Sequence, residues 1–462
     1  MALIKSISGI RGTIGGDVGN NLTAQDIVEC SAAFGHWVKQ KTNNPRIVIG
    51  RDGRISGEIV NNLVVNALRM VGVDVIDLGL STTPTVEMAV PWEGAGAGII
   101  ITASHNPKEW NALKFVNDKG EFISHQDGSD VLQLIEDKAI DYVDVNSLGS
   151  YEQKDGYIQK HIDTIFEMPL VDTDVIKAKG FKIVVDCINS TGSLSVIPML
   201  EQLGCEVIGL NTEPNGQFAH NPEPRPDHLI ELSKTVLETR ADLGIAVDPD
   251  VDRLAFMSED GEMFGEEYTL VAVADYVLRH TKGNTVSNLS STRALRDITE
   301  KHGGTYYASA VGEVNVVNKM KEVNAVIGGE GNGGVIVPGL HYGRDALVGI
   351  GLFLTHLANF GKSISYLRST YPSYVISKNK IQLTPDIDVD LLLNKLEEKY
   401  KRQPHTTIDG LKVEFDKDWI HLRKSNTEPI IRIYAESTSE VTADNLANKI
   451  KMDVKDILQS NL

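Results

Sequence analysis

The same order of apolar and polar segments occurs three times along the chain. A run of aliphatic residues predicts a buried strand, apolar residues at helical spacing predict a helix, and glycine closes it before a second strand. Strand, helix, strand in this order builds a parallel sheet covered by helices. The three copies are 46–52, 58–72 and 73–79; then 182–187, 193–204 and 205–211; then 284–290, 291–304 and 305–310.

The first predicted helix shows the spacing in detail. Ile59, Leu63, Met70 and Val71 recur at intervals that place them on one side of a helix over residues 58–72. An amphipathic helix turns its apolar side to the core. We therefore expect these four side chains to face the first sheet.

Each copy is followed by a short apolar strand that ends in a polar or glycine-rich loop. The three segments are GIIITASHNP (98–107), LGIAVDPDVDR (243–253) and AVIGGEGNGG (325–334). Ligands of open α/β sheets bind beyond the carboxyl ends of the strands. The three loops are therefore expected to face one common cleft.

The C-terminal part of the chain has a different pattern. Residues 418–425 and 430–437 predict two strands, and helices are expected around 387–402 and 441–458. This is typical of a smaller α+β domain with an antiparallel sheet. We therefore predict an α/β protein with four domains around a central cleft, three of them similar mixed-sheet α/β domains. The predicted domains are 1–150, 151–258, 259–370 and 371–462.

Composition limits the classes of function. The chain has 462 residues, 41% of them apolar and 23% charged, and it shows no apolar run long enough for a membrane span and no secretory signal. Its net charge of −18 argues against a nucleic-acid binder, whose affinity rests on Lys and Arg. Cys30, Cys187 and Cys205 are far apart and are expected to be reduced and buried, in a cytoplasmic protein.

The segment DPDVDR (248–253) is the sharpest chemical signal. Asp248, Asp250 and Asp252 alternate, and alternate side chains of an extended segment point the same way. Crowded carboxylates suit Mg²⁺ or Ca²⁺, and Mg²⁺ keeps positions open for phosphate oxygens. An EF-hand is excluded because its sixth position would be Arg253 instead of glycine and a strand follows. A solvated acidic turn is the alternative.

Two further loops suit phosphate and sugar groups. RKSNTEPIIR (423–432) combines arginines with a tight turn, a combination that fits an anion, although an exposed hairpin tip is the alternative. In GGEGNGG (328–334), Glu330 and Asn332 can hydrogen-bond sugar hydroxyls, although a flexible loop is equally compatible. The candidate anion ligands are Arg423, Ser425, Asn426, Thr427 and Arg432.

The loop TASHNP (102–107) places Ser104 and His105 directly after a buried strand. Asn-Pro alone predicts a polar turn, which is the alternative to a functional loop. A serine needs a base, a metal or a lowered barrier to act as a nucleophile. With metal and phosphate ligands expected in other domains, phosphoryl transfer to and from Ser104 is the chemistry we predict. Nothing local decides whether Arg11 and Lys114 are more than surface charges.

These motifs resemble those of the α-D-phosphohexomutase superfamily, which includes phosphoglucomutase, phosphomannomutase and phosphoglucosamine mutase. TASHNP resembles its phosphoserine loop, DPDVDR its metal loop, GEGNGG its sugar-recognition loop and RKSNTEP its phosphate-binding loop. The resemblance covers essentially the whole chain, with one motif per domain in the right order.

The resemblance implies a role for each candidate residue. Ser104 would carry a phosphate that one Mg²⁺ per chain bridges to the three aspartates. Arg253 would balance the phosphoryl charge, Lys114 would act as general acid or base, and Arg11 and His105 would adjoin the phosphoserine. Glu330 and Asn332 would read the sugar, and the non-reacting phosphate would be held by Arg423, Ser425, Asn426, Thr427 and Arg432.

The sugar loop departs from the pattern of many family members. Asn332 and Gly334 stand where those members have Ser and His, so a histidine that can contact the substrate is missing. This leaves substrate identity and the second acid/base group open. His341, in GLHYGRDA, is a candidate replacement.

The resemblance therefore implies a phosphohexomutase, an intramolecular phosphotransferase that works through a hexose 1,6-bisphosphate. Phosphoglucosamine mutase is the favoured activity, with phosphomannomutase or phosphoglucomutase as the alternative. A sugar-phosphate phosphatase and a non-catalytic sensor are further alternatives. The partners are small hexose phosphates, with no nucleic acid or membrane, and the protein is expected to be a monomer or homodimer.

Overall fold

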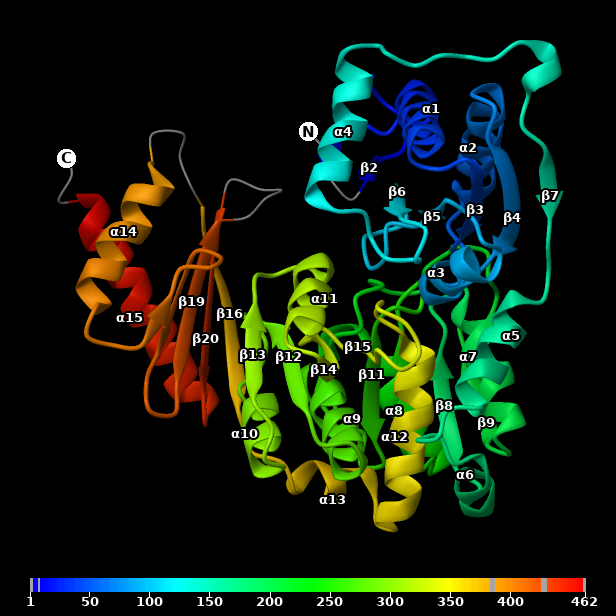
Figure 1. Cartoon of the computed structure of the whole chain (residues 1–462). Coiled ribbons are helices and arrows are strands. Elements are labelled where there is room, and N and C mark those ends of the chain that lie inside the picture. The colour runs from blue at the N-terminus through cyan, green and yellow to red at the C-terminus, as the bar shows by residue number, and fades with distance from the viewer. Residues whose placement is uncertain (1–2, 7–8, 383–386, 425–429, 460–462) are drawn as a thin grey trace.

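The computed structural model describes residues 3–6, 9–382, 387–424 and 430–459. These residues form four β-sheets, each with its own helices, and the four units follow one another along the chain (Figure 1). The first three sheets are mixed and the fourth is antiparallel. The predicted fold class is confirmed.

The first unit is built on a sheet with the strand order β1-β2-β6-β5-β3-β4-β7. Strands β3, β4 and β5 are parallel, and β6 turns the sheet antiparallel next to β5. Because β7 pairs with β4, this sheet extends past residue 150. Its elements are β1 Ile4–Ser6, β2 Gly9–Thr13, α1 Ala24–Lys41, β3 Arg46–Arg51, α2 Gly57–Met70, β4 Asp74–Leu80, α3 Thr83–Trp92, β5 Ala97–Ile101, β6 Trp110–Val116, α4 His125–Glu136, a 3₁₀ turn Val145–Ser147 and β7 Tyr151–Gln153.

The prediction of which side of α2 faces the core is wrong in part. Ile59 and Met70 are 68% and 52% exposed. Val60, Val64 and Leu68 are buried instead, at the four-residue spacing of one helix face. Residues one position apart lie about 100° apart around a helix, so the buried face is rotated by one residue from the predicted one.

The second and third units repeat the same plan with smaller sheets, in the orders β11-β10-β8-β9 and β13-β12-β14-β15. The predicted strand pairs β8–β9 and β12–β13 are parallel, as β3–β4 is in the first unit. The elements are α5 Tyr157–Phe166, α6 Thr173–Lys179, β8 Lys182–Asp186, α7 Gly192–Gln202, β9 Glu206–Leu210, a 3₁₀ turn Pro226–His228, α8 Ile230–Thr239, β10 Leu243–Val247 and β11 Leu254–Ser258; then α9 Glu266–His280, β12 Asn284–Asn288, α10 Ala294–Lys301, β13 Tyr306–Ser309, α11 Glu313–Glu322, β14 Ala325–Glu330, β15 Gly334–Ile336, α12 Ala346–Phe360 and α13 Ile364–Ser369.

These two units share one hydrophobic core. Its buried residues run from Ile162 in α5 to Tyr371, and α12 supplies many of them. That helix is buried along most of its length because it packs against α5 and α6 on one side and α9 on the other. The first and fourth units have separate cores, so the second and third units act as one body to which the others are attached.

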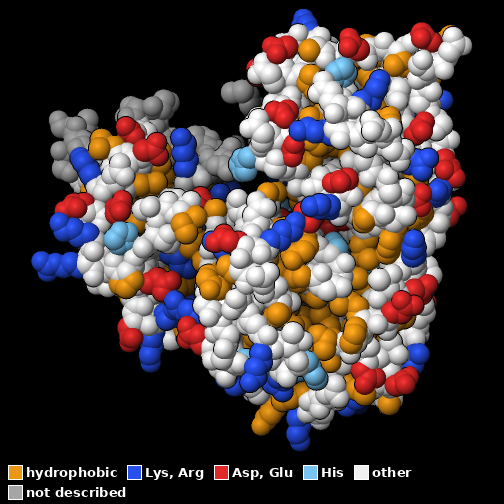
Figure 2. Space-filling model, viewed as in Figure 1, with side chains coloured by type: hydrophobic (Ala, Val, Ile, Leu, Met, Phe, Trp, Pro, Cys, Tyr) orange, Lys and Arg blue, Asp and Glu red, His pale blue; other side chains and the backbone are white. Residues whose placement is uncertain are grey.

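The C-terminal unit is an antiparallel sheet in the order β16-β20-β19-β18-β17, with two helices on one face (Figure 1). The space-filling view is hollowed between this unit and the first one (Figure 2). Its elements are β16 Val375–Gln382, α14 Val389–Tyr400, β17 His405–Thr406, β18 Leu411–Glu414, β19 Trp419–Lys424, β20 Ile430–Ser437 and α15 Glu440–Gln459.

Two expectations from composition can be compared with the structure. Cys30, Cys187 and Cys205 are free thiols, but Cys205 is only partly buried. Within the described residues, no helix combines the length and apolar character needed to cross a membrane.

Candidate active site

The loop after β5 presents Ser104 to the second unit. Ser104 is 5% exposed and has a φ of 48°, a left-handed conformation that costs energy for a residue with a Cβ. Its amide donates to Thr102 Oγ1 at 2.9 Å, and its Oγ donates to Asp248 Oδ2 at 2.6 Å. The strained turn therefore aims the hydroxyl at the acidic loop of the next domain.

Arg54 holds the serine loop in place, and the sequence reasoning missed it. This buried guanidinium donates to the backbone carbonyls of four loop residues at 2.5 to 2.8 Å, namely Ser104, Asn106, Pro107 and Trp110. Its Nε donates to Asp52 Oδ2 at 3.0 Å, and Thr102 Oγ1 donates to the same oxygen. A hint of this role was present in the segment RDGR (51–54), which begins at the last residue of the buried strand β3. The other candidate loops also follow the ends of buried strands.

The three aspartates of DPDVDR lie together, but not for the reason predicted. The segment is a turn and not an extended strand, and Val251 has a φ of 61°. The amides of Asp252 and Arg253 donate to Asp248 Oδ1 at 3.2 and 3.1 Å, which closes the turn. β11 then continues as a strand, in agreement with the exclusion of an EF-hand.

The acidic triad fits a hard cation. Asp248, Asp250 and Asp252 are fully buried, and one oxygen of each lies within 4.8 Å of the others. Asp250 Oδ1 and Asp252 Oδ1 have no hydrogen-bond partner although they are buried. Burial, together with the charges of Asp250 and Asp252, raises the pKa of Asp248 well above its usual range. Unpaired buried oxygens that repel one another are the donor set that Mg²⁺ prefers.

Lys114 lies on the other side of the triad. Its Nζ donates to Asp250 Oδ2 at 2.7 Å and lies 3.5 Å from Asp252 Oδ2. Burial alone lowers the pKa of Lys114, but the two carboxylates outweigh it and raise the pKa above its usual value. Thr83 Oγ1, on the first residue of α3, donates to Asp250 Oδ2 at 2.6 Å. The structure thus brings Lys114 to the site as an ammonium ion.

Three further predicted residues surround Ser104. His105 Nδ1 lies 3.3 Å from Ser104 Oγ, and burial, aided by Arg253 and Arg11, holds the pKa of His105 well below its usual value. Arg11 NH1 donates to Asn106 Oδ1 at 3.0 Å. Arg253 pairs loosely with Glu223 at 3.6 Å, and its Nε is buried without a partner. A neutral imidazole therefore adjoins the hydroxyl, and the charges of Arg253 and Arg11 act on that imidazole.

The sugar-recognition loop contributes Glu330 and Asn332. Glu330 is 5% exposed, and its Oε1 accepts from Asn288 Nδ2 at 2.8 Å. Asn332 Oδ1 accepts from the Gly334 amide at 3.2 Å, and its Nδ2 approaches Glu330 Oε2 at 3.4 Å. The loop is held by its own hydrogen bonds, which disagrees with the alternative of a flexible loop.

Arg344 joins the sugar loop to the acidic triad, and the sequence reasoning missed it as well. It donates to Asp252 Oδ2 at 2.7 Å, to Glu330 Oε2 at 3.1 Å and to Glu313 Oε2 at 2.9 Å. A Cβ on Gly334 would meet Arg344 Cδ at 2.4 Å. Arg344 therefore passes through the space that a side chain at position 334 would need.

His341, the candidate replacement for the histidine missing at position 334, contacts two carboxylates. Its ring lies between Asp345, 3.3 Å from Nε2, and Glu87, 3.4 Å from Nδ1. Among the described residues, its hydrogen bonds and ion pairs do not include Glu330 or Asn332. The expectation that His341 serves the sugar loop finds no support in these contacts.

The predicted phosphate loop is described only at its two ends, because Ser425, Asn426 and Thr427 lie outside the described residues. Arg423 of β19 stands directly opposite Arg432 of β20, and Arg432 stands opposite Lys380 of β16. Cations directly opposite one another across strands repel. Arg423, Arg432 and Lys380 thus stand in one row across three strands, and Arg423 Nε lies 3.5 Å from Asp409 Oδ2. Lys380 is a member of this row that the sequence reasoning missed.

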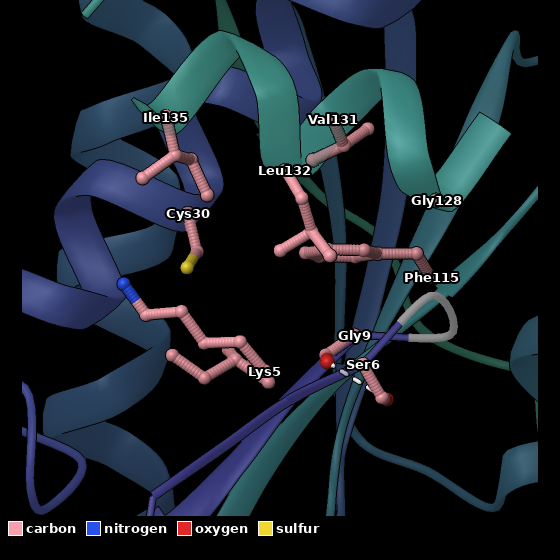
Figure 3. Close-up of a pocket in the computed structure, with 10 residues that line it drawn as sticks. Lys5, Ser6, Gly9, Cys30, Phe115, Gly128, Val131, Leu132 and Ile135 are labelled. Carbon is pink, nitrogen blue, oxygen red and sulfur yellow. Dashed lines mark hydrogen bonds between the residues drawn. The ribbon is translucent and has the colours of Figure 1, made fainter. Parts of the chain in front are cut away.

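A small apolar cavity lies away from these loops, between α1, α4 and the β1–β2 edge of the first sheet (Figure 3). Val131 and Leu132 of α4 lie over Phe115, and Ile135 of the same helix lies over Cys30 of α1. The cavity volume is about 10 Å³, hardly enough for one water molecule. Burial raises the pKa of Cys30 to about 12, so its thiol stays protonated. The cavity is a gap in packing and not a second site.

Comparison with known proteins links the four units to one family. Profiles described as phosphoglucomutase/phosphomannomutase, alpha/beta/alpha domains I, II and III and C-terminal domain, match residues 3–140, 157–261, 265–374 and 384–452. The probable phosphoglucosamine mutase of Methanopyrus kandleri is 33% identical over 96% of this chain and 95% of its own. The phosphoglucomutase/phosphomannomutase of Thermococcus kodakarensis is 34% identical over 94% and 95%.

Another relative and a solved structure point to the same family. The phosphoglucosamine/phosphogalactosamine mutase of Sulfurisphaera tokodaii is 32% identical over 98% of this chain and all of its own. The crystal structure of a phosphoglucomutase/phosphomannomutase family protein from Burkholderia thailandensis superposes with a TM-score of 0.84, at 28% identity over 98% of this chain and 97% of that one.

Proposed function

The chain belongs to the phosphoglucomutase/phosphomannomutase family of phosphohexomutases, and on that premise we propose that it interconverts glucosamine 6-phosphate and glucosamine 1-phosphate through a phosphoserine at Ser104. One observation carries the proposal: a strained, buried serine donates its Oγ hydrogen bond at 2.6 Å to an acidic triad from another domain. Glucosamine is favoured because relatives from Methanopyrus kandleri and Sulfurisphaera tokodaii carry that substrate in their names.

The reaction has two phosphoryl transfers. In the first, the P–O bond to Ser104 breaks, a hydroxyl oxygen of the sugar monophosphate takes the phosphoryl group, and the serine oxygen takes a proton. The product is a hexose 1,6-bisphosphate. After the sugar reorients, its other phosphate returns to Ser104, and the released hydroxyl regains a proton. Atoms and charges balance over the cycle without another reactant.

Asp248, Asp250 and Asp252 would hold Mg²⁺ together with an oxygen of the Ser104 phosphate, one ion per chain. Their two buried, unpaired oxygens support this assignment. A bound Mg²⁺ would neutralise charge on the phosphoryl oxygens. Asp248 also fixes the direction of Ser104 Oγ through their hydrogen bond.

The surrounding residues then divide the remaining work. Lys114, kept protonated beside Asp250, would stabilise phosphoryl charge and supply a proton to an oxygen. Arg253 and Arg11 would contact the phosphoryl group, and neutral His105 would orient the serine hydroxyl. Positioning and charge stabilisation are the main sources of rate in phosphoryl transfer.

The substrate's other phosphate would bind the C-terminal domain. Arg423 and Arg432, adjacent across β19 and β20, support this role, as does Lys380 beside them. Ser425, Asn426 and Thr427 complete the proposed set. Because this domain has its own core, a hinge movement would let it release the bisphosphate for reorientation and close again.

The remaining assignments are also proposals. We propose domain boundaries near residue 154, after β7, and near 258 and 370, and a monomer or homodimer in the cytoplasm. The free thiols of Cys30, Cys187 and Cys205 support that compartment. A hexose 1,6-bisphosphate would serve as primer, and one solved neighbour, an N-acetylphosphoglucosamine mutase variant of Aspergillus fumigatus, was crystallised with glucose 1,6-bisphosphate.

Phosphomannomutase or phosphoglucomutase activity is the second candidate, favoured by the name of the Thermococcus kodakarensis relative. A side-by-side assay on glucosamine, glucose and mannose phosphates, each with Mg²⁺ and its own bisphosphate primer, separates the two. The highest kcat/KM for glucosamine phosphate supports the proposal, and the highest value for another sugar replaces it. Release of free phosphate without isomerisation would instead indicate a phosphatase.

A further inference from the structure

A second cluster of metal-type ligands lies behind the acidic triad, where three domains meet. His161 of α5, His341 of the loop after β15 and Asp345 at the start of α12 each place one ligand atom within 4.8 Å of the others. Both imidazole Nε2 atoms face the same oxygen, Asp345 Oδ2, at 2.9 and 3.3 Å. The two rings are nearly perpendicular, at 85°.

The far nitrogen of each imidazole has an oxygen partner on α3. His161 Nδ1 lies 3.0 Å from Thr85 Oγ1, and His341 Nδ1 lies 3.4 Å from Glu87 Oε2. When Nδ1 carries its proton toward such an acceptor, the Nε2 lone pair points at the common centre. This is the arrangement that orients histidine ligands in zinc sites.

Glu87 gives an independent sign that the cluster is incomplete. It is 1% exposed, and neither of its carboxylate oxygens makes a hydrogen bond of regular geometry, because the approach of His341 Nδ1 to Oε2 is loose, at 3.4 Å. Its approach to His341 depends on Gly343, because a Cβ there would meet Glu87 Oε2 at 1.9 Å and the His341 ring at 2.8 Å. A buried, unbonded carboxylate aimed at an imidazole is costly unless the ring carries positive charge or a metal.

Asp345 has one carboxylate oxygen, Oδ2, that is not used to cap α12. Its Oδ1 accepts from the amides of Leu347 and Val348 at 2.8 and 3.3 Å, which caps α12. Its Oδ2 is left to the two histidines. The edge of a tetrahedron with metal–ligand bonds of about 2.0 Å measures about 3.3 Å. The two distances from Asp345 Oδ2 to the imidazole nitrogens, 2.9 and 3.3 Å, are close to this value, and the two imidazole nitrogens lie within 4.8 Å of each other.

We propose that His161, His341 and Asp345 bind one Zn²⁺ ion at a structural site that joins the first three domains, with Glu87 and Thr85 orienting the imidazoles. Two nitrogen ligands favour Zn²⁺ over Mg²⁺, which prefers oxygen ligands only. Of the three ligands only His341 is exposed in part, with 12% of its side chain accessible, while the side chains of His161 and Asp345 are fully buried. The ion enters from that side.

The site adjoins the active centre without sharing its ligands. Thr83, which bonds Asp250, lies one helical turn before Glu87 on α3, and Arg344, which bonds Asp252, immediately precedes Asp345. A metal ion here fixes α3 against α5 and α12. Its expected effect is therefore on stability and on the alignment of the domains.

Binding of Co²⁺, a spectroscopic probe for zinc sites, tests the proposal on the whole protein. The chain is stripped with a chelator and supplied with excess Mg²⁺ to fill oxygen sites, and Co²⁺ is then titrated. We expect one Co²⁺ per chain with the visible absorption of tetrahedral nitrogen coordination, displaced by Zn²⁺ but not by Mg²⁺. Zn²⁺ should also raise the melting temperature.

Variants assign the signal to the cluster. His341→Gln should weaken Co²⁺ binding by more than about 100-fold, and Glu87→Gln by about 10-fold. His302→Gln is the matched control, because Asp275 also has two histidines nearby but is occupied by Arg279 at 2.5 Å. Should His161→Gln fail to fold, the partly exposed His341 still gives the result. No tight Co²⁺ site in the wild type, or equal binding by His341→Gln, would show that the cluster is only an ion pair.

Discussion

Arg344 and Asp252 are joined by a hydrogen bond of 2.7 Å that connects the sugar-recognition loop of the third domain to the acidic triad of the second. The same guanidinium contacts Glu330 and Glu313, so three carboxylates share this cation. The shared core of the two domains keeps this connection rigid. In the proposed mechanism, Arg344, which lies in neither loop, would therefore align sugar recognition with phosphoryl transfer.

The first prediction concerns Arg344. Replacing it with Gln removes the charge that balances Asp252, Glu330 and Glu313, and we expect kcat/KM to fall by about 100-fold. Lys should restore only part of the activity because it cannot make the three directed contacts. Arg296→Lys, at a cation paired with Glu414 away from the site, is the control. Unchanged kinetics in Arg344→Gln would contradict the role assigned to it.

Arg54 should matter for stability as well as activity. Arg54→Met leaves Asp52 buried without its partner and frees four loop carbonyls, so we expect unfolding free energy to fall by about 3–5 kcal/mol. The double variant with Asp52→Asn should recover part of this loss. Denaturant titration of both variants measures the effect. Equal stabilities for the single and double variants would show that the two residues are not coupled.

The row formed by Arg423, Arg432 and Lys380 in the C-terminal domain is expected to contribute to substrate binding. Arg423→Ala should raise KM about 10-fold and leave the concentration of Mg²⁺ needed for half activity unchanged, because Arg423 lies in a different domain from the triad. Lys380→Ala should show a smaller increase because its side chain is exposed. Lys417→Ala, in the turn at the other end of the β18–β19 hairpin, serves as the control. An unchanged KM in Arg423→Ala would exclude a contact with the substrate.

Glu267 predicts a pH dependence of stability. Burial raises its pKa to about 8 from 4.5, although Lys378 lowers it in part. Between these two pH values the folded chain keeps a proton on Glu267 that the unfolded chain releases. The contribution of Glu267 to the free energy of unfolding is therefore fully present below pH 4.5 and is lost as the pH rises to about 8.

Glu267→Gln removes this loss. We expect the variant to melt at a higher temperature than the wild type at about pH 9 and to lose that advantage at about pH 4.5. Melting temperatures across this range provide the measurement. Parallel curves for the two proteins would mean that Glu267 is ionised in the folded state throughout.

Much of the fold was readable from the sequence because each strand and helix is specified locally. The apolar run at 243–247 predicts β10, and the loop after it predicts an acidic cluster. The path of that loop was not predictable: a left-handed Val251 and two amides on Asp248 form the turn. The carbonyls of Asp250 and Val251 also accept from the amides of Thr83 and Ala346, which belong to other domains. Local spacing gives no signal for such contacts.

Arg54 and Arg344 were missed for a related reason. An arginine next to an aspartate is common in any loop, and only the folded chain shows that Arg54 reaches residue 104 and Arg344 reaches residue 252. The buried side of α2 was misjudged because Ile59 and Val60 are both apolar, and packing decides between faces that spacing leaves similar.

In the proposed mechanism Ser104 carries the transferred phosphate, and intact-protein mass measurement followed by peptide mapping shows whether it does. The protein is incubated with Mg²⁺ and a hexose 1,6-bisphosphate, beside Ser104→Ala. The account predicts one added phosphate, located on Ser104, in the wild type, and neither phosphate nor turnover in the variant. Turnover by Ser104→Ala above about one tenth of the wild-type rate, or phosphate on a different residue, would contradict the account.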